Sequence, residues 1–356
     1  EKRVASALIT RLKLMSGLDI SEKRLPQDGR FQVLVKDHHV DVRLSTLPIQ
    51  GGESVVMRLL DQTGNILSVD QLGMPPGVSE RYRRLMKRPH GLVLVTGPTG
   101  SGKTTTLYSA LNEINDPQTK IITVEDPVEY RLTRINQVQV NPKIDLTFAR
   151  VLRAVLRQDP DVVMIGEMRD QETAEIALRA AMTGHLVFST LHTNDAVSTV
   201  NRLIDMGVPG YMVATALEGV IAQRLLRRVC DSCQRPYEPT PGERAWLRDL
   251  LKADADRLAL MTGVGCAYCN NTGYRGRVGV YELLEMDRAM TDALRRDDGA
   301  AFEQAALASP DFVSLAQVGL QYAARGVTSL AEVIRATGGV DESFDIAAPA
   351  SVVTQG

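Results

Sequence analysis

The chain has 356 residues, 44% of them hydrophobic and 24% charged, an ordinary balance for a soluble globular protein of two or three packing units. Its formal net charge is −2, from 41 basic and 43 acidic side chains, and this lack of a basic excess argues against nucleic acid or an anionic membrane as a partner. No apolar run approaches the roughly 20 residues that cross a bilayer and no signal peptide opens the chain, so we expect a cytosolic protein.

Residues 1–62 are expected to form a small α/β domain. Apolar side chains recur at helical spacing over 2–17, and from Arg30 they alternate with polar ones in three runs, as in antiparallel strands. Residues 36–39 would join the first two strands as a hairpin. The stretch 63–76 indicates a linker because it concentrates turn-forming residues, namely Gly64, Asn65, Gly73, Pro75 and Pro76.

Residues 77–227 alternate apolar strands with helices, which predicts a parallel sheet covered by helices on both faces. The expected fold class is therefore α/β, with a RecA-like P-loop NTPase core. The strands are expected at 91–96, 120–124, 161–165 and 185–190. Three segments follow the core, and we expect them to be a cysteine-bearing segment, a helical segment and a disordered tail at 228–285, 286–337 and 338–356.

The most specific motif is the run Gly97-Pro98-Thr99-Gly100-Ser101-Gly102-Lys103-Thr104, which fits G-x-x-x-x-G-K-[ST] in full. It follows an expected strand and precedes an expected helix at 105–114, so its backbone N–H groups can surround phosphates at a helix N-terminus. Lys103 would reach the β- and γ-phosphates of ATP or GTP, and Thr104 would bind Mg²⁺. The alternative is a chance glycine-rich turn.

Two acidic strand ends could complete such a site. Glu167 follows the strand 161–165, where a Walker B acid that binds Mg²⁺ should lie, although a surface acid is the alternative. The strand 120–124 leads into Glu125, Asp126 and Glu129, whose mutual repulsion a metal ion or cationic partner would relieve. Glu129 is the candidate for orienting water, and a solvated loop is the alternative.

The four cysteines form two pairs, Cys230-x-x-Cys233 and Cys266-x-x-Cys269. In a reducing compartment two such pairs indicate a metal site rather than disulfides. Four thiolates suit a tetrahedral structural Zn²⁺. The alternative is four unrelated buried thiols.

Together these segments resemble the secretion ATPase superfamily, which contains the motors of type II secretion and of type IV pili. Residues 156–170, from Leu156 to Asp170, are similar to its Walker B signature, 121–130 to its aspartate box, and 183–194 to its histidine box. The resemblance covers nearly the whole chain. It implies that 1–62 is the family's second N-terminal domain, and that a further domain precedes residue 1. The opening Glu1 in place of Met likewise suggests a piece of a longer protein.

The resemblance assigns roles to individual residues. It implies that Glu167 is the Walker B acid, Glu129 the catalytic glutamate and His192 a sensor of the nucleotide, with His185 in support. Arginines of the first domain would reach the nucleotide, and the candidates are Arg30, Arg43 and Arg58. The expected nucleotide contacts are Gly97, Thr99, Gly100, Ser101, Gly102, Lys103, Thr104, Thr105, Glu125 and Arg58.

The function that the resemblance implies is an ATP-hydrolysing homo-hexamer that drives assembly of a type IV pilus or a type II secretion pseudopilus. Its partners would be an inner-membrane platform protein and a membrane-associated docking protein, which make it peripheral to the inner membrane of a bacterium. Residues 173–184 and 205–207 look most similar to motors of mannose-sensitive-haemagglutinin pili, with type II secretion motors next. Assembly ATPases commonly carry the cysteine pairs, whereas retraction motors lack them.

Two other classes of protein remain open at this point. A nucleic-acid-translocating P-loop ATPase should have a basic channel and stacking aromatics, but aromatic residues are only 4% of the chain. A nucleotide-binding regulator that does not hydrolyse would keep the phosphate loop and need neither Glu129 nor Glu167.

Overall fold

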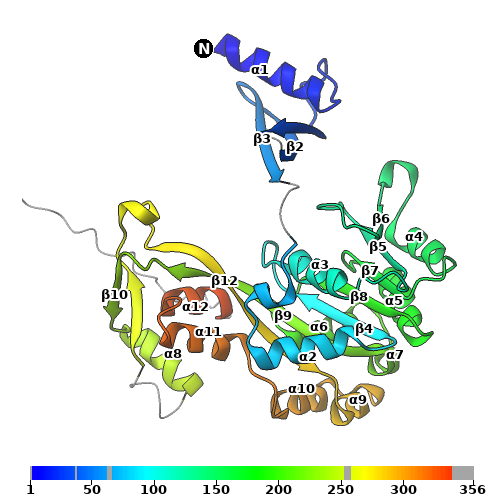
Figure 1. Ribbon diagram of the computed structural model, residues 1–356, viewed down its shortest axis with the longest axis vertical. Helices are drawn as coiled ribbons and strands as arrows, with labels where there is room; N and C mark the ends of the chain where they lie inside the picture. Colours follow the sequence, from blue (N-terminus) through cyan, green and yellow to red (C-terminus); the bar gives the residue numbers. More distant parts are fainter. Residues whose placement is uncertain (1, 37, 62–65, 252–257, 339–356) are drawn as a thin grey trace, which may run out of the picture. The chain divides into compact units, whose positions relative to one another are not determined.

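The computed structural model describes residues 2–36, 38–61, 66–251 and 258–338. The chain divides into two compact units. Figure 1 shows its helices and strands, coloured by position in the sequence. Unit 1 comprises Glu1–Ile66 and Pro127–Thr133, and unit 2 comprises Leu67–Asp126 and Arg134–Gly356. The tail for which we predicted disorder lies outside the described residues apart from Gly338, as does Asp37 of the predicted hairpin.

Unit 1 packs one helix on a three-stranded antiparallel sheet. Its elements, with strand order β1-β2-β3, are α1 (Lys2–Met15), β1 (Gln27–Val35), β2 (His38–Ile49) and β3 (Gly52–Asp61). The helix covers one face of the sheet, because a Cβ on Gly29 would lie 2.6 Å from the carbonyl oxygen of Ser16. Val42 and Leu44 are buried on the central strand, at alternate positions that point to the same face.

Unit 2 is built on a seven-stranded sheet of order β12-β9-β4-β8-β7-β5-β6. All pairs in it are parallel except β12 with β9, which are antiparallel. The strands are β4 (Gly91–Thr96), β5 (Ile121–Glu125), β6 (Asn136–Gln139), β7 (Val162–Ile165), β8 (Leu186–Leu191), β9 (Leu217–Val229) and β12 (Tyr274–Glu285). Every residue of the four central strands β4, β5, β7 and β8 is buried. Since successive side chains point to opposite faces, helices must cover both faces of this part of the sheet.

The helices of unit 2 are spread along its sequence, and the helices near its C-terminus share one hydrophobic core with those in its middle. They are α2 (Pro76–Met86), α3 (Lys103–Glu113), α4 (Phe148–Val155), α5 (Gln171–Met182), α6 (Ala196–Asp205), α7 (Gly210–Ala216), α8 (Pro241–Leu251), α9 (Arg288–Arg295), α10 (Gly299–Ala308), α11 (Leu315–Ala324) and α12 (Leu330–Thr337). Short 3₁₀ turns lie at Val69–Leu72, Pro142–Ile144 and Ala267–Cys269. A separate two-stranded antiparallel sheet pairs β10 (Gln234–Tyr237) with β11 (Leu260–Gly263). None of the helices in the described ranges is long and apolar enough to cross a membrane.

The four predicted strands of the core are present, each displaced by no more than one residue, and the mostly parallel sheet is confirmed. The structure divides the chain differently from the predicted segments in two places. Val69 and Leu72, in the predicted linker, are buried in unit 2. The predicted cysteine-bearing segment ends in β12, which pairs with β9 along most of its length, so only the part between these strands stands apart from the sheet.

Candidate functional site

The phosphate loop joins β4 to α3, as its motif predicted. Gly97 has φ 145° and Gly102 has φ 91°, in the region that L side chains rarely adopt. A Cβ on Gly97 would lie 2.4 Å from the carbonyl oxygen of Gln223, so no larger residue fits there. Gly102 precedes α3 and has no side chain to cap it, which leaves the first N–H groups of the helix for an anion.

Polar groups of the loop fit a phosphate ligand. The hydroxyl of Ser101 is buried and has no hydrogen-bond partner among the described residues, as expected of a group that completes its bonding with a ligand. Thr99, Gly100 and Thr104 are exposed, and Thr105 is half-buried. Thr104 is the second residue of α3, where its hydroxyl is accessible to a metal ion.

Lys103 is buried and folds back over its own loop. Its Nζ donates to the carbonyl oxygens of Gly97 at 2.8 Å and Pro98 at 3.2 Å. Burial lowers the pKa of Lys103 to about 8, an effect that the nearby Arg224 adds to and the nearby Glu167 opposes. A bound polyphosphate would favour the charged ammonium, so this residue suits an anionic ligand.

Glu167 and His192 join Lys103 at the same edge of the sheet. Glu167 follows β7, and His192 follows β8. Nε2 of His192 lies 3.4 Å from Oε2 of Glu167, and its Nδ1 lies 3.5 Å from Nζ of Lys103. Arg169 forms an ion pair with the other oxygen of Glu167. His185 lies elsewhere: it precedes β8, and its Nδ1 is 3.0 Å from the carbonyl oxygen of Ala180.

Glu125 points into the protein instead of toward the loop surface. It is 3% exposed, and its carboxylate accepts hydrogen bonds from Tyr108, from Thr123 at 2.5 Å and from Gln137 at 3.1 Å. These donors come from α3, β5 and β6. Its carboxylate is therefore occupied by protein donors, although the sequence predicted a nucleotide contact for it.

The structure adds two residues to the site that sequence reasoning missed. Gln223 and Arg224 lie on β9, where successive side chains point to opposite faces of the sheet. Gln223 accepts a hydrogen bond from Thr106 of α3 at 2.7 Å, and Arg224 donates to the carbonyl oxygen of Asn194 at 2.7 Å. The available signal was two polar residues between the apolar runs 220–222 and 225–226 of β9.

The candidate arginines lie in one row on unit 1. The strand register places Arg30 opposite Arg43 and Arg43 opposite Arg58, on the sheet face away from α1. Acidic side chains of the same unit lie beside this row, and Nε of Arg43 is 3.9 Å from Oδ2 of Asp41. Glu129 belongs to the same unit, and its Oε2 lies 2.9 Å from Nη2 of Arg43.

The four cysteines come together as the sequence predicted. Their Sγ atoms all lie within 4.8 Å of one another, with 3.9 Å from Cys230 to Cys266, 3.9 Å from Cys233 to Cys269 and 3.7 Å from Cys266 to Cys269. Four sulfurs placed tetrahedrally around zinc at 2.3 Å would be about 3.8 Å apart, so the cluster fits this metal. Burial raises the pKa of the Cys269 thiol, but N–H donors from Cys266 and Gly273 outweigh it and bring the pKa to about 6.

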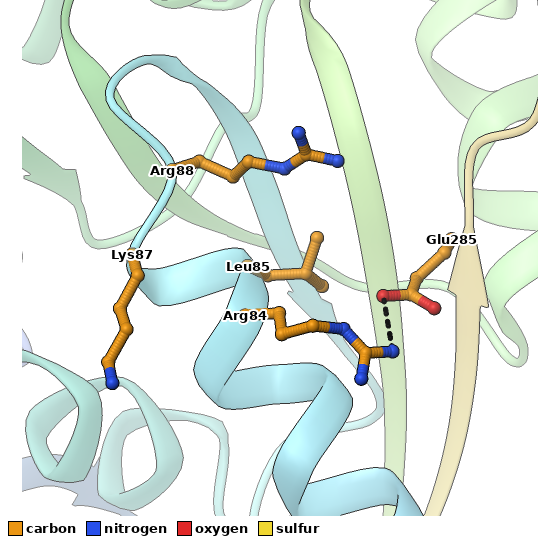
Figure 2. Close-up of a pocket in the computed structure, with 5 residues that line it drawn as sticks. All are labelled: Arg84, Leu85, Lys87, Arg88 and Glu285. Atoms are coloured by element: carbon orange, nitrogen blue, oxygen red, sulfur yellow. Dashed lines mark ion pairs between the residues drawn. The ribbon is translucent and has the colours of Figure 1, made fainter.

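A cavity of about 400 Å³ lies at the other edge of the sheet. Figure 2 shows its lining of Arg84, Leu85, Lys87, Arg88 and Glu285, with Arg84 directed toward Glu285 at 3.9 Å. Arg84 and Leu85 lie in the last turn of α2, Lys87 and Arg88 lie between α2 and the start of β4, and Glu285 ends β12. The phosphate loop follows the opposite end of β4. The cavity is therefore not part of the phosphate-loop site.

Comparison with known proteins agrees with this geometry. The family model described as "Type II/IV secretion system protein" matches residues 1–335. The type II secretion system ATPase E of Vibrio cholerae serotype O1 is 50% identical over 337 residues, 94% of this chain and 66% of that protein. The type II secretion system protein E of Pseudomonas aeruginosa is 49% identical over 342 residues, with coverage of 95% and 66%. The chain thus spans just under two thirds of the length of these relatives.

Solved structures share the architecture. The pilus retraction motor PilT with bound ADP superposes with a TM-score of 0.64 at 31% identity, over 90% of this chain and 79% of that one. The ATPase DotB of Yersinia pseudotuberculosis has a TM-score of 0.66 at 22% identity over 92% and 81%, a likeness of fold alone. With the family model matched over 335 residues and the phosphate loop in place, this chain belongs to the type II/IV secretion system protein family.

Proposed function

We propose that this chain is a Mg²⁺-dependent ATPase that powers assembly of a type IV pilus or a type II secretion pseudopilus. The observation that carries the proposal is the convergence of Lys103, Glu167 and His192, with the histidine within 3.5 Å of both charged groups. A protein that only binds nucleotide needs a phosphate loop but no acid and histidine beside it. The ATPase among its relatives supports the same activity.

We propose a separate role in phosphoryl transfer for each residue at this edge of the sheet. Lys103 would contact the β- and γ-phosphates, and Thr104 and Glu167 would hold Mg²⁺, since hydroxyl and carboxylate oxygens are its preferred ligands. The ion neutralises charge that develops on the phosphates when it is bound. His192 would respond to the nucleotide through its contacts with Lys103 and Glu167. We assign Glu125 the role of ordering α3, β5 and β6 rather than binding nucleotide.

Unit 1 would supply the remaining groups. We propose that Arg30, Arg43 and Arg58 stabilise charge on the phosphates and that Glu129 orients the attacking water. The placement of the three arginines side by side on one face of the sheet supports the first role. The ion pair between Arg43 and Glu129 would then be exchanged for contacts with substrate.

The assembly and the partners are also proposals. We propose a homo-hexamer, peripheral to the bacterial inner membrane through a platform protein and a membrane-associated docking protein. The supporting observations are the family and the type II secretion names of the relatives. We propose Zn²⁺ as the metal of the cysteine cluster, which supports the assembly class of motor. Pili of the mannose-sensitive-haemagglutinin type are proposed as one filament that it could serve.

The test is hydrolysis of Mg-ATP by the full chain and by Glu167→Gln. We expect kcat to fall roughly 100-fold or more in Glu167→Gln, because the carboxylate acts in the phosphate-transfer step. Glu175→Gln is the matched control, since Glu175 lies on α5 and pairs with Arg179 at 3.7 Å instead. Equal rates in wild type and Glu167→Gln would contradict the assignment, and stimulation by added DNA would favour a nucleic-acid translocase.

A further inference from the structure

The segment 194–196 links the His192 loop to α6, and a buried arginine holds it. Only Thr193 separates His192 from Asn194, and Ala196 is the first residue of α6. Arg224 donates through Nη2 to the carbonyl oxygen of Asn194 at 2.7 Å and to its side-chain oxygen at 3.2 Å. Its Nε donates to the carbonyl oxygen of Ala336 at 3.1 Å. One guanidinium therefore spans the loop and the last turn of α12.

A buried carboxylate holds the same segment from β12. Glu282 is 2% exposed, and its two oxygens accept N–H bonds from Ala196 at 2.7 Å and from Leu315 at 2.9 Å. Leu315 is the first residue of α11. One carboxylate therefore caps the helix that follows the His192 loop together with a helix of the C-terminal segment.

The two charged groups act from one face of the sheet. Arg224 lies opposite Val280 in the antiparallel pair, so Glu282, two residues further along β12, points to the same side. The helix dipoles favour both charges, because the Arg224 cation lies at the C-terminus of α12 and the Glu282 anion lies at the N-termini of α6 and α11. Both side chains satisfy buried backbone groups that an apolar residue would leave unpaired, so they fix where the segment 194–196 lies relative to α11 and α12.

We infer that Arg224 and Glu282 are positioning residues for hydrolysis, which tie the exit of the His192 loop to α11 and α12. A displacement of these C-terminal helices would thereby change where His192 lies relative to Lys103 and Glu167. The helices would control the chemical step without contacting nucleotide. This inference rests on the proposed ATPase function, and it names the part of the chain through which a partner could regulate that function.

The experiment compares the wild-type chain with the variants Arg224→Gln and Glu282→Gln. We expect kcat for Mg-ATP to fall about tenfold or more in each, because a small misplacement of a group in the site slows the reaction strongly. The dissociation constant for ADP should stay within about threefold, since neither residue is placed against the phosphate loop's ligand. Thermal unfolding and sizing of each variant establish that it is folded and assembled.

Arg227→Gln is the matched control. Arg227 lies on the same strand and holds the same helix α12, through Nη2 to Oε2 of Glu332 at 2.7 Å, but no contact joins it to 194–196 among the described residues. We expect its kcat to stay within about twofold of wild type. An equal loss of kcat in Arg227→Gln would show that anchoring α12 is what matters, and would overturn the inference.

Two further measurements apply if a variant folds poorly or if the wild-type chain does not hydrolyse ATP. They are the kcat of Arg224→Lys and the amide hydrogen exchange of the segment 190–198. Arg224→Lys keeps the charge but cannot span both carbonyl oxygens, so its kcat should also fall, and wild-type activity in it would contradict the inference. Amide hydrogen exchange of the peptide 190–198 should be faster in Arg224→Gln or Asn194→Ala than in wild type. Unchanged exchange in both would overturn the coupling, whereas an inactive wild type would overturn the proposed function alone.

Discussion

At the residue scale, Lys103 is the centre of the candidate site, because its Nζ donates to the carbonyl oxygen of Gly97 in its own loop and lies 3.5 Å from Nδ1 of His192. Residues 97–104 carry their own geometry, because the glycines permit the φ angles that the turn requires. Glu167 followed from its place after a buried strand and His192 from a resemblance, and the structure brings both to Lys103. Glu125 could not be read in the same way, since its donors Tyr108 and Gln137 lie on elements that are distant in sequence.

The lowered pKa of Lys103 makes nucleotide binding depend on pH. Because the pKa is about 8 in the free protein, the ammonium is largely charged at pH 7 and largely neutral at pH 9. A bound phosphate needs the charged form, so the affinity for ADP should fall as pH rises, by up to about tenfold per unit above pH 8. Calorimetry at pH 7, 8 and 9 should also detect proton uptake on binding.

Lys103→Arg provides the control for this prediction, because an arginine stays charged throughout the range. The variant should bind ADP with an affinity that is nearly independent of pH. A dissociation constant of the wild type that does not change between pH 7 and 9 would contradict the assignment of this dependence to Lys103.

At the scale of elements, apolar runs predicted the four central strands, because a strand buried on both faces is continuously hydrophobic. Three strands of the seven-stranded sheet escaped prediction: β6 is mostly polar, Gln223 and Arg224 interrupt β9, and exposed residues open β12. The cysteine pairs predicted their cluster correctly. Spacing alone could not show that the strands on either side of it would pair within the main sheet.

The cysteine cluster should bind one Zn²⁺ per chain and stabilise the adjoining ends of β9 and β12. We expect Cys269→Ser to lower the zinc content, measured by elemental analysis, and to reduce Tm by about 5–10 °C, since each kcal/mol shifts Tm by about 2–4 °C in a unit of this size. A fully metal-loaded variant with unchanged Tm would exclude a structural site at these residues.

At the scale of the whole molecule, the sequence indicated two bodies joined by a linker, but the boundary depends on packing that no local pattern shows. Val69 and Leu72 are buried in unit 2 although they lie among turn residues. Residues 127–133 belong to unit 1, so the chain leaves unit 2 after β5 and returns to it at Arg134. Glu129 thus belongs to unit 1, whereas the phosphate loop belongs to unit 2.

We propose that hydrolysis depends on assembly of the chains, because the residues proposed for it come from both units. The most direct test is the specific activity for Mg-ATP as a function of protein concentration, with Glu167→Gln measured in parallel and the assembly state followed by sizing. We predict activity that rises as the chains assemble and is lost in Glu167→Gln at every concentration. Absence of hydrolysis by fully assembled wild-type protein, or equal hydrolysis by assembled Glu167→Gln, would contradict it.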